Sequence, residues 1–187
     1  SHGADIVQFP EFEYGARRNP RTNRIIRFFS KRIAAHVLPS AALEQFSIEI
    51  GVDEARRIVI PNGLPVGDEP DFEYVDGQAE SDVVALKQKN IDGLRFLSLS
   101  SGRPIKNLSV LVRAFAVARP DLGDSRLLLA CVGSSADHIH ELVEDLGLVD
   151  VVDFIGEVRG LEKRNIFMSS DVYCQVSHFE NSPVSLL

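Results

Sequence analysis

Apolar positions in the central part of the chain alternate between continuous runs and helical spacing. Residues 96–99 form one largely apolar run, and residues 127–132 form a second that Gly133 ends. Between the runs, apolar residues recur three and four positions apart, the spacing of one buried helix face: Leu108, Leu111, Val112, Phe115 and Ala116. Continuous apolar strands are typical of parallel sheets covered on both faces. The pattern predicts a strand–helix–strand unit with a right-handed crossover.

The same alternation continues to the end of the chain. It predicts helices over 137–146, 161–169 and from 184 onward, and strands over 151–155 and 171–176. Gly147 is expected to end the first of these helices as its C-cap. This order of elements is that of an α/β fold with a doubly wound parallel sheet, whose ligands bind at the carboxyl ends of the strands.

The first sixty residues have a weaker pattern. It predicts strands over 4–9, 36–39 and 58–60, a helix over 22–37, and a second helix that Ser40 caps and Gly51 ends. The apolar face of the first helix comprises Ile25, Ile26, Phe29, Ile33 and Val37, and that of the second comprises Leu43, Phe46 and Ile50. Asn62-Gly63 predicts a tight turn with positive φ.

Residues 17–32 form a strongly basic segment, with seven cations and no acid among them. A basic amphipathic helix can lie on an anionic membrane surface. The alternative is a helix with its apolar face in a core and its charges in water, and this is the commoner arrangement. Peripheral membrane contact through residues 17–32 is therefore the second interpretation.

Residues 64–92 are rich in proline, glycine and acids, and predict an interdomain linker. We therefore expect residues 1–63 and residues 93–187 to belong to two domains.

The overall composition excludes some functions. The net charge of −7 argues against a nucleic-acid binder. Cys131 and Cys174 lie in strand-like runs without metal-type spacing, which predicts buried, reduced thiols. No signal-peptide pattern or membrane-spanning run is present, so a cytoplasmic, or membrane-peripheral, location is expected.

A basic loop follows the first central strand. Gly102, Arg103, Lys106 and Asn107 precede a helix N-terminus, which favours bound anions, phosphates above all. A solvated basic loop is the alternative. The topology should bring this loop to the same sheet edge as three others: 133–135, 156–158 and 177–183. Glu180 precedes the last predicted helix, where it could accept sugar hydroxyls or simply cap the helix.

Five segments occur in an order that resembles one enzyme family: IVIPNGL (58–64), SSGRPIKNL with LVRAF (100–115), LLLACVG (127–133), VDFIGEV (152–158) and SHFENSPVSLL (177–187). Together they resemble the second, donor-binding half of a retaining glycosyltransferase of family 4, which has the GT-B fold. The resemblance covers about residues 36–187, and it implies a hexosyltransferase-type enzyme. It also implies that residues 1–63 are the C-terminal part of the first, acceptor-side domain. Residues 93–187 would then form a truncated, Rossmann-like donor-binding domain, and the chain would be a piece of a longer protein.

This resemblance implies roles for individual residues. Lys106, with Arg103, would hold the diphosphate of a nucleotide-sugar donor, beside Gly102, Asn107 and Gly133. Gly156, Glu157 and Val158 would lie against the nucleobase. Glu180 matches the first glutamate of a Glu-x7-Glu motif and would contact the donor sugar, while Asn181 and Ser182 would supply backbone N–H groups. Glu180 and Lys106 would be the catalytic pair.

The resemblance also implies partners and limits. The acceptor would be a saccharide or a lipid-linked molecule, and neither a metal nor another cofactor is expected. The second glutamate of the motif would be residue 188, and the acceptor-site residues are absent, so the chain alone is expected to be inactive. Two alternatives are a GT-B-type sugar-nucleotide epimerase and a non-catalytic nucleotide-binding module.

Overall fold

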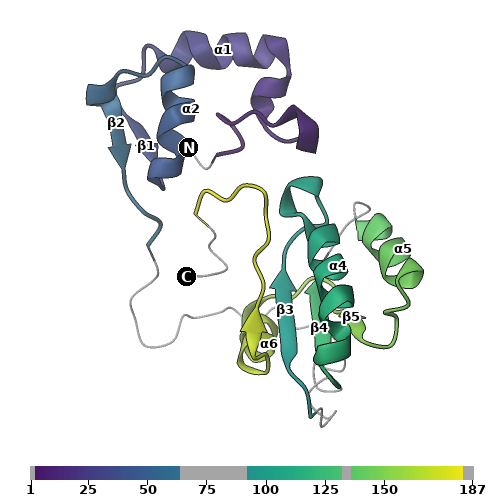
Figure 1. The fold of residues 1–187 in the computed structure, drawn as a ribbon. Helices are drawn as coiled ribbons and strands as arrows, with labels where there is room; N and C mark the ends of the chain where they lie inside the picture. The colour runs from purple at the N-terminus through teal and green to yellow at the C-terminus, as the bar shows by residue number, and fades with distance from the viewer. Residues whose placement is uncertain (1–2, 64–91, 132–135, 183–187) are drawn as a thin grey trace. The chain divides into compact units, whose positions relative to one another are not determined.

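The computed structural model describes residues 3–63, 92–131 and 136–182. These residues fall into two compact units (Figure 1). The first unit contains residues 3–63 together with 179–182, and the second contains the described residues from 92 to 178. The predicted linker, apart from residue 92, and Gly133 lie outside the described residues.

The first unit is built on two short parallel strands. Strand β1 (His36–Leu38) pairs with β2 (Arg57–Val59), with His36 opposite Arg57 and Leu38 opposite Val59. The helices of this unit are α1 (Pro20–Ser30) and α2 (Glu44–Glu49), and short 3-10 turns surround them: Pro10–Phe12, Ala16–Arg18, Ala41–Leu43 and Glu54–Arg56. A core of apolar residues includes Leu38, Leu43 and Phe46.

Helix α1 is shorter than predicted and presents a different face. The Asn19 side chain caps it by accepting from the N–H groups of Arg21 and Thr22, and the helix ends at Ser30, before the chain enters β1. Ile25 and Phe29, predicted to be buried, are 57% and 60% exposed. The prediction was wrong for these two residues, whereas Ile26 and Ile33 of the same predicted face are partly buried against the core of this unit.

Two other predictions for the first unit are also wrong, and a third holds only in part. Residues 4–9 form turns with a single bridge between Phe9 and Tyr14 instead of a strand, although Ile6 and Val7 are buried as expected. Asn62 and Gly63, which follow β2, do not adopt a positive φ. Ser40 stands at the N-cap position of the 3-10 turn that leads into α2, as predicted, but its side chain makes no capping hydrogen bond.

The second unit contains a four-stranded sheet in the order β5-β4-β3-β6, and all three strand pairs are parallel. The strands are β3 (Arg95–Leu99), β4 (Arg126–Ala130), β5 (Val152–Phe154) and β6 (Val172–Tyr173). Phe96 lies opposite Leu127 on β4 and opposite Val172 on β6. Parallel strands here are continuous apolar runs because both sheet faces are covered.

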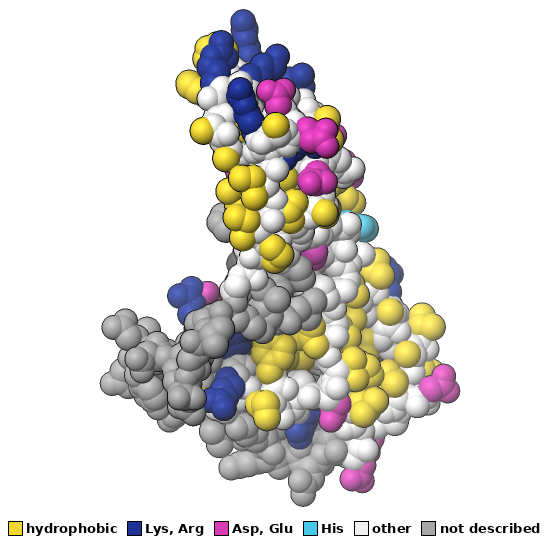
Figure 2. Space-filling view, turned by 90° about the vertical axis from the view of Figure 1, so that its left-hand side faces the viewer, with side chains coloured by type: hydrophobic (Ala, Val, Ile, Leu, Met, Phe, Trp, Pro, Cys, Tyr) yellow, Lys and Arg dark blue, Asp and Glu magenta, His cyan; other side chains and the backbone are white. Residues whose placement is uncertain are grey.

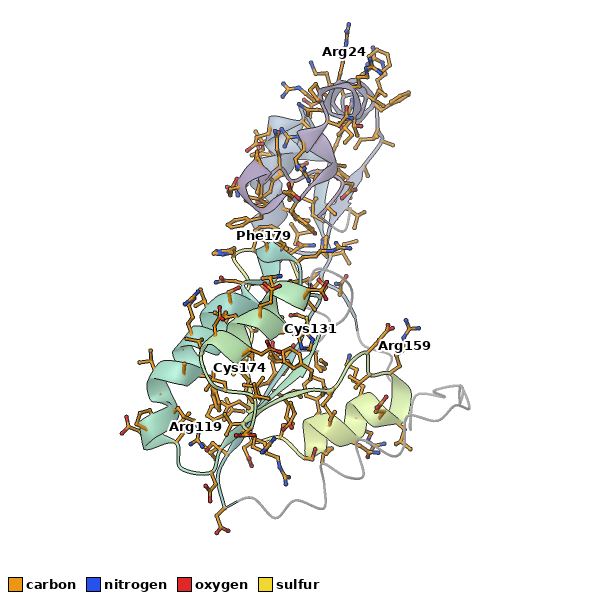
Figure 3. All side chains as sticks on the ribbon, turned by 90° about the vertical axis from the view of Figure 1, so that its right-hand side faces the viewer. Arg24, Arg119, Cys131, Arg159, Cys174 and Phe179 are labelled. Carbon is orange, nitrogen blue, oxygen red and sulfur yellow. The ribbon has the colours of Figure 1, made fainter. Side chains whose placement is uncertain are left out.

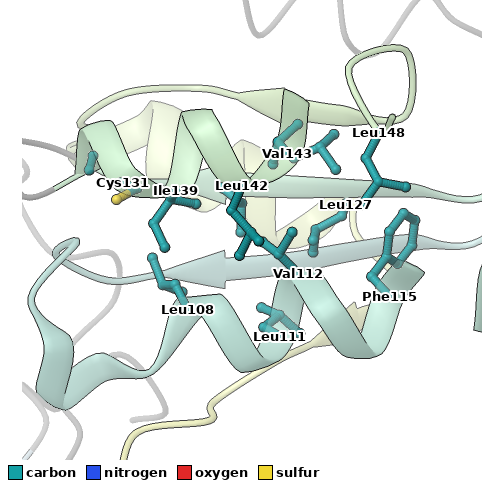
Figure 4. Packing of buried hydrophobic residues seen from close by; sticks show 13 residues of the cluster. Leu108, Leu111, Val112, Phe115, Leu127, Cys131, Ile139, Leu142, Val143 and Leu148 are labelled. Atoms are coloured by element: carbon teal, nitrogen blue, oxygen red, sulfur yellow. The ribbon is translucent and has the colours of Figure 1, made fainter. Parts of the chain in front are cut away.

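Helices lie on both faces of this sheet. Helices α4 (Leu108–Ala118) and α5 (Asp137–Asp145) pack on one face against Leu127, Leu129 and Val152. Figure 4 shows side chains of α4 and α5 directed toward each other and toward the sheet. Helix α6 (Gly160–Met168) covers the other face, where Ile166 packs on Leu97 and Leu128. The fold is therefore a doubly wound α/β sheet, as predicted.

The strand order identifies where a ligand would bind. From β3 the chain moves outward through β4 to β5, and it then returns to the opposite side of β3 to form β6. The direction of winding therefore reverses between β3 and β6. In open α/β sheets, ligands bind at such a switch point, outside the carboxyl ends of the two strands.

Candidate functional site

The loop after β3 carries the predicted anion-binding residues. Ser100 N–H donates to the carbonyl of Ala130 at the end of β4 (3.2 Å), and Gly102 is buried. Arg103 is exposed, and Pro104–Lys106 forms a single 3-10 turn. Helix α4 starts two residues after Lys106. The loop thus places both cations immediately before a helix N-terminus, where backbone N–H groups and the helix dipole favour an anion.

Asn107 ends this loop in a left-handed conformation, with φ 57° and ψ 30°. Asparagine tolerates this backbone better than most residues. The Asn107 side chain donates from Nδ2 to the carbonyl of Val176 (3.2 Å), and His178 N–H donates to the carbonyl of Ile105 (2.9 Å). Two hydrogen bonds therefore join the basic loop to the segment that follows β6.

The segment after β6 is held along the sheet edge by its own side chains. Cys174 N–H donates to the carbonyl of Leu97 (2.7 Å), which extends the pairing with β3 by one residue. The Tyr173 hydroxyl lies 3.1 Å from Oε1 of Gln175, and Nε2 of Gln175 donates to Oγ of Ser177 (2.9 Å). This polar series leads from β6 to the loop where Glu180 follows.

The loop after β5 carries the third predicted group. Ile155 N–H donates to the carbonyl of Leu129 (3.0 Å), and Gly156 then adopts φ 68°, which favours glycine. The carboxylate of Glu157 pairs with the guanidinium of Arg159, one of the side chains labelled in Figure 3. Val158 packs on the cluster between the sheet and α6.

Glu180, Asn181 and Ser182 belong to the first unit. Asn181 Oδ1 accepts from Oγ of Ser40 (2.7 Å), and Ser182 Oγ accepts from Nδ2 of Asn62 (3.2 Å). The preceding Phe179 packs on the rings of Phe9 (5.0 Å between centroids) and Phe46 (5.7 Å) (Figure 3). The side chains of Asn181 and Ser182 are therefore used within this unit.

The structure thus divides the predicted site residues into groups. Arg103, Lys106 and Asn107, with Gly102, lie at the switch point beside the segment after β6. Residues 156–158 follow β5, which lies on the other side of β4 from β3. The partners Ser40, Asn62 and the carbonyl of Val176 were not predicted, because no local pattern marks them: Ser40 and Asn181 are 141 positions apart.

Two thiols lie near these strand ends (Figure 3). Cys131 is buried and Cys174 is partly buried, and both are free. Burial raises the pKa of each thiol above its usual value, so neither is an activated nucleophile at neutral pH. Among residues 3–63, 92–131 and 136–182, no group of three His, Cys, Asp or Glu side chains is placed to hold a metal.

Comparison with protein families identifies the chain. The model of the family described as "Glycosyl transferases group 1" matches residues 85–187, which is more than half of the sequence. The chain belongs to this family of glycosyltransferases. A search of curated proteins found no match.

Solved structures share the fold. HepE from Anabaena, crystallised with UDP and glucose, superposes with a TM-score of 0.72 over 99% of this chain and 48% of its own, at 18% identity. Sucrose-phosphate synthase from Thermosynechococcus elongatus gives 0.68 over 98% and 45%, at 17% identity. TarM from S. aureus, crystallised with fondaparinux, α-GlcNAc-glycerol and UDP, gives 0.64 over 88% and 29%, at 16% identity.

These neighbours define the fold as GT-B, the architecture of nucleotide-sugar glycosyltransferases. The chain spans less than half the length of each of the three. In the part of the chain that the structure describes, no helix has the length and apolar character required to cross a membrane.

Proposed function

We propose that this chain carries most of the donor-binding part of a retaining glycosyltransferase of the family 4 type, which transfers a hexose from a nucleotide diphosphate to an acceptor. The observation that carries the proposal is the pair of hydrogen bonds at the switch point, from Asn107 to Val176 and from His178 to Ile105. They hold a basic loop and the segment leading to Glu180 together where a ligand of this fold binds.

In the proposed mechanism, Lys106 and Arg103 stabilise the negative charge that develops on the leaving diphosphate. Preorganised donors aimed at a developing charge contribute a large share of catalysis. Glu180, two residues beyond the anchored His178, contacts the donor sugar and orients it. Backbone N–H groups of Asn181 and Ser182 assist, and residues 156–158 lie against the base. These roles use no metal.

The neighbours support a proposal for the donor. HepE was crystallised with UDP-glucose as well as with UDP, and TarM was crystallised with UDP. A UDP-sugar is therefore the donor we propose, with a saccharide or lipid-linked acceptor on the cytoplasmic side. The acceptor would be bound by parts of a longer protein, because the neighbours are more than twice as long as this chain.

Calorimetric titration of the chain with UDP tests the proposal. Lys106→Ala should weaken UDP binding about ten-fold or more, because a charge-assisted hydrogen bond contributes about 1.5–3 kcal/mol. Uridine, which lacks the diphosphate, should bind both proteins alike. Arg113→Ala removes an exposed cation from α4, away from the basic loop, and should leave both affinities unchanged.

Equal losses for UDP and uridine in the Lys106 variant would contradict the diphosphate role. Turnover is measured with UDP-glucose and a protein that includes the remaining domain. Conversion of the donor without an acceptor would indicate the epimerase. Binding without any conversion would indicate a nucleotide-binding module. Retention of the anomeric configuration, followed by NMR, separates retaining from inverting transfer.

A further inference from the structure

The alternation of faces that begins in β6 continues beyond its last residue, Tyr173. Successive side chains of an extended chain point to opposite faces. Cys174 and Val176 pack on the cluster that α4 and α5 cover, whereas Tyr173 packs on the cluster that α6 covers. Gln175 and Ser177 follow Tyr173 at intervals of two, so they belong to the α6 side. Packing accounts for the first pair but gives no reason for an amide and a hydroxyl on the other face.

Gln175 joins the hydroxyl groups on either side of it. The Tyr173 hydroxyl lies 3.1 Å from Gln175 Oε1, and Gln175 Nε2 donates to Ser177 Oγ at 2.9 Å. The Tyr173 hydroxyl also lies 3.4 Å from the carbonyl oxygen of Leu99, the last residue of β3. An amide supplies both an acceptor and a donor at the end of one side chain, so glutamine suits a position between two hydroxyls.

The backbone of the same segment holds the basic loop. The carbonyl of Val176 accepts from Asn107 Nδ2 (3.2 Å), and His178 N–H donates to the carbonyl of Ile105 (2.9 Å). Both contacts depend on the path that this backbone takes after β6. The bond from the glutamine amide to the serine hydroxyl spans the peptide groups on both sides of Val176, and it therefore restricts rotation there.

The basic loop carries few charges of its own. A dense group of cations lies elsewhere, since Figure 2 shows dark blue side chains gathered at the end of the first unit that bears α1. Residues 100–107 contain two cations, Arg103 and Lys106, of which Arg103 is exposed and Lys106 is partly buried. Charged donors contribute most when the structure holds them in place before the ligand arrives. The affinity of this loop for an anion therefore depends on where its backbone places the two cations.

We propose that Gln175 is a positioning residue for the diphosphate site and acts through Lys106. Its amide fixes the path of residues 173–178, this segment holds the basic loop, and the loop sets the position of the Lys106 ammonium. All of these residues belong to the second unit, and none of the contacts requires an exposed surface. The role of Gln175 rests on the function proposed above, because the anion is the diphosphate of UDP.

Calorimetric titration with UDP and with uridine tests this role. Gln175→Met replaces the amide with an apolar chain of similar length and removes both hydrogen bonds. It should weaken UDP binding about three- to five-fold, and it should leave uridine binding unchanged because uridine has no diphosphate. Gln45→Met makes the same change at an exposed position of α2 in the first unit, and it should leave both affinities unchanged.

Combination with Lys106→Ala separates positioning from a general loss of structure. If Gln175 acts through Lys106, Gln175→Met should change the UDP affinity of the Lys106→Ala protein by less than about 1.5-fold. Tyr173→Phe removes one hydroxyl partner but keeps the ring that stacks on Phe167 (5.2 Å between centroids). It should weaken UDP binding about two-fold alone and add nothing to Gln175→Met, because the two changes remove the same hydrogen bond.

Three results would overturn the positioning role. They are an unchanged UDP affinity in Gln175→Met, an equal loss of UDP and uridine, and a full loss that persists in the Lys106→Ala protein. If circular dichroism shows that Gln175→Met does not fold, Tyr173→Phe and Ser177→Ala provide the same test, and each should weaken only UDP binding, about two-fold. Failure of the unmodified chain to bind UDP would contradict the proposed function, and the role of Gln175 with it.

Discussion

Asn107 illustrates how one side chain can meet two demands. The loop turns into α4 through a left-handed residue, and asparagine tolerates this conformation. Its amide then reaches the carbonyl of Val176 across the switch point. The sequence suggested a donor-binding role for Asn107. The structure supports a positioning role, in which Asn107 fixes the basic loop against the segment after β6.

Substitutions at Asn107 should separate these two demands. Asn107→Gly keeps the left-handed backbone but removes the amide donor, whereas Asn107→Ala removes the donor and also strains the backbone. We expect urea unfolding to show Asn107→Ala to be less stable than Asn107→Gly by about 1 kcal/mol. Both variants should bind UDP more weakly than the unmodified chain does. Their loss of UDP affinity should be smaller than that of Lys106→Ala.

Equal stability of the Gly and Ala variants would contradict the left-handed conformation. Unchanged UDP affinity in both would show that the bond to Val176 does not position the loop. A Ser109→Ala variant is a suitable control, because Ser109 is two residues further along and lies within α4.

At the same scale, the site could be predicted from sequence only where its pattern is local. The position of Arg103 and Lys106 between β3 and α4 could be predicted, because a short basic loop stands between an apolar strand and an amphipathic helix. The bonds from Ser40 to Asn181 and from Asn62 to Ser182 could not be predicted. They join segments more than a hundred residues apart, and short polar side chains carry no periodic signal of their own.

Among the elements, those of the second unit were predicted well. The apolar runs that become β3 and β4 are continuous because both faces of the sheet are covered. Four of the five predicted inward residues of α4 are buried, and Ala116 is partly buried. β6 is shorter than predicted, because after Cys174 the chain leaves β3 to meet the basic loop.

In the first unit the pattern was misleading. The 3.6-residue period from Ile25 to Val37 runs across the end of α1 and into β1. Helical spacing of apolar residues usually marks a buried face, but Ile25 and Phe29 are exposed on this one. Apolar residues at helical spacing have the same sequence signature whether their stripe is buried or exposed, which explains the error.

Gly93 shows how closely two elements approach. A Cβ at this position would lie 2.2 Å from the backbone nitrogen of Ser125, just before β3 and β4 begin. Next to it, Leu94 N–H donates to Oγ of Ser125 (2.8 Å), and Arg126 N–H donates to the carbonyl of Leu94 (2.9 Å). Glycine is required here by the close approach of two backbones.

Gly93→Ala should therefore push apart the backbones that meet where β3 and β4 begin. Overpacking costs about 1–3 kcal/mol, and we expect the upper end because the obstructing atoms are backbone. The melting temperature should fall by about 6–12 °C. Gly63→Ala is the matched control, since a Cβ there meets nothing within 4 Å. A Gly93 variant as stable as this control would contradict the close approach.

At the scale of the whole molecule, the two units have separate hydrophobic cores. One cluster, around Leu43 and Phe46, lies in the first unit, and two clusters on opposite faces of the sheet lie in the second. Units with separate cores can unfold as distinct transitions. A titratable group buried in one core should then affect the transition of that unit alone.

His36 is such a group. Its side chain is buried beside α2, and Nδ1 lies 2.8 Å from Oγ of Ser47. Burial lowers the pKa of His36 below the usual 6.5, although the charge of Asp5 opposes the shift. The unfolded chain therefore binds a proton more readily than the folded unit, so stability contributed by His36 is present above pH 6.5 and is lost as the pH falls below it.

Calorimetric scans at about pH 7.5 and about pH 5 should resolve this effect. We expect the transition of the first unit to move to lower temperature at the acidic pH, while His36→Gln, which remains neutral and can still meet Ser47, shows a smaller decrease. The other histidines are common to both proteins, so the difference between the two scans belongs to His36. The Gly93→Ala variant identifies the transition of the second unit, because it lowers the temperature of that transition. The temperature of this transition should differ between the two pH values by the same amount with and without His36. An equal response of both transitions to His36→Gln would mean that the two cores unfold together, and the chain would then have to be treated as one cooperative structure.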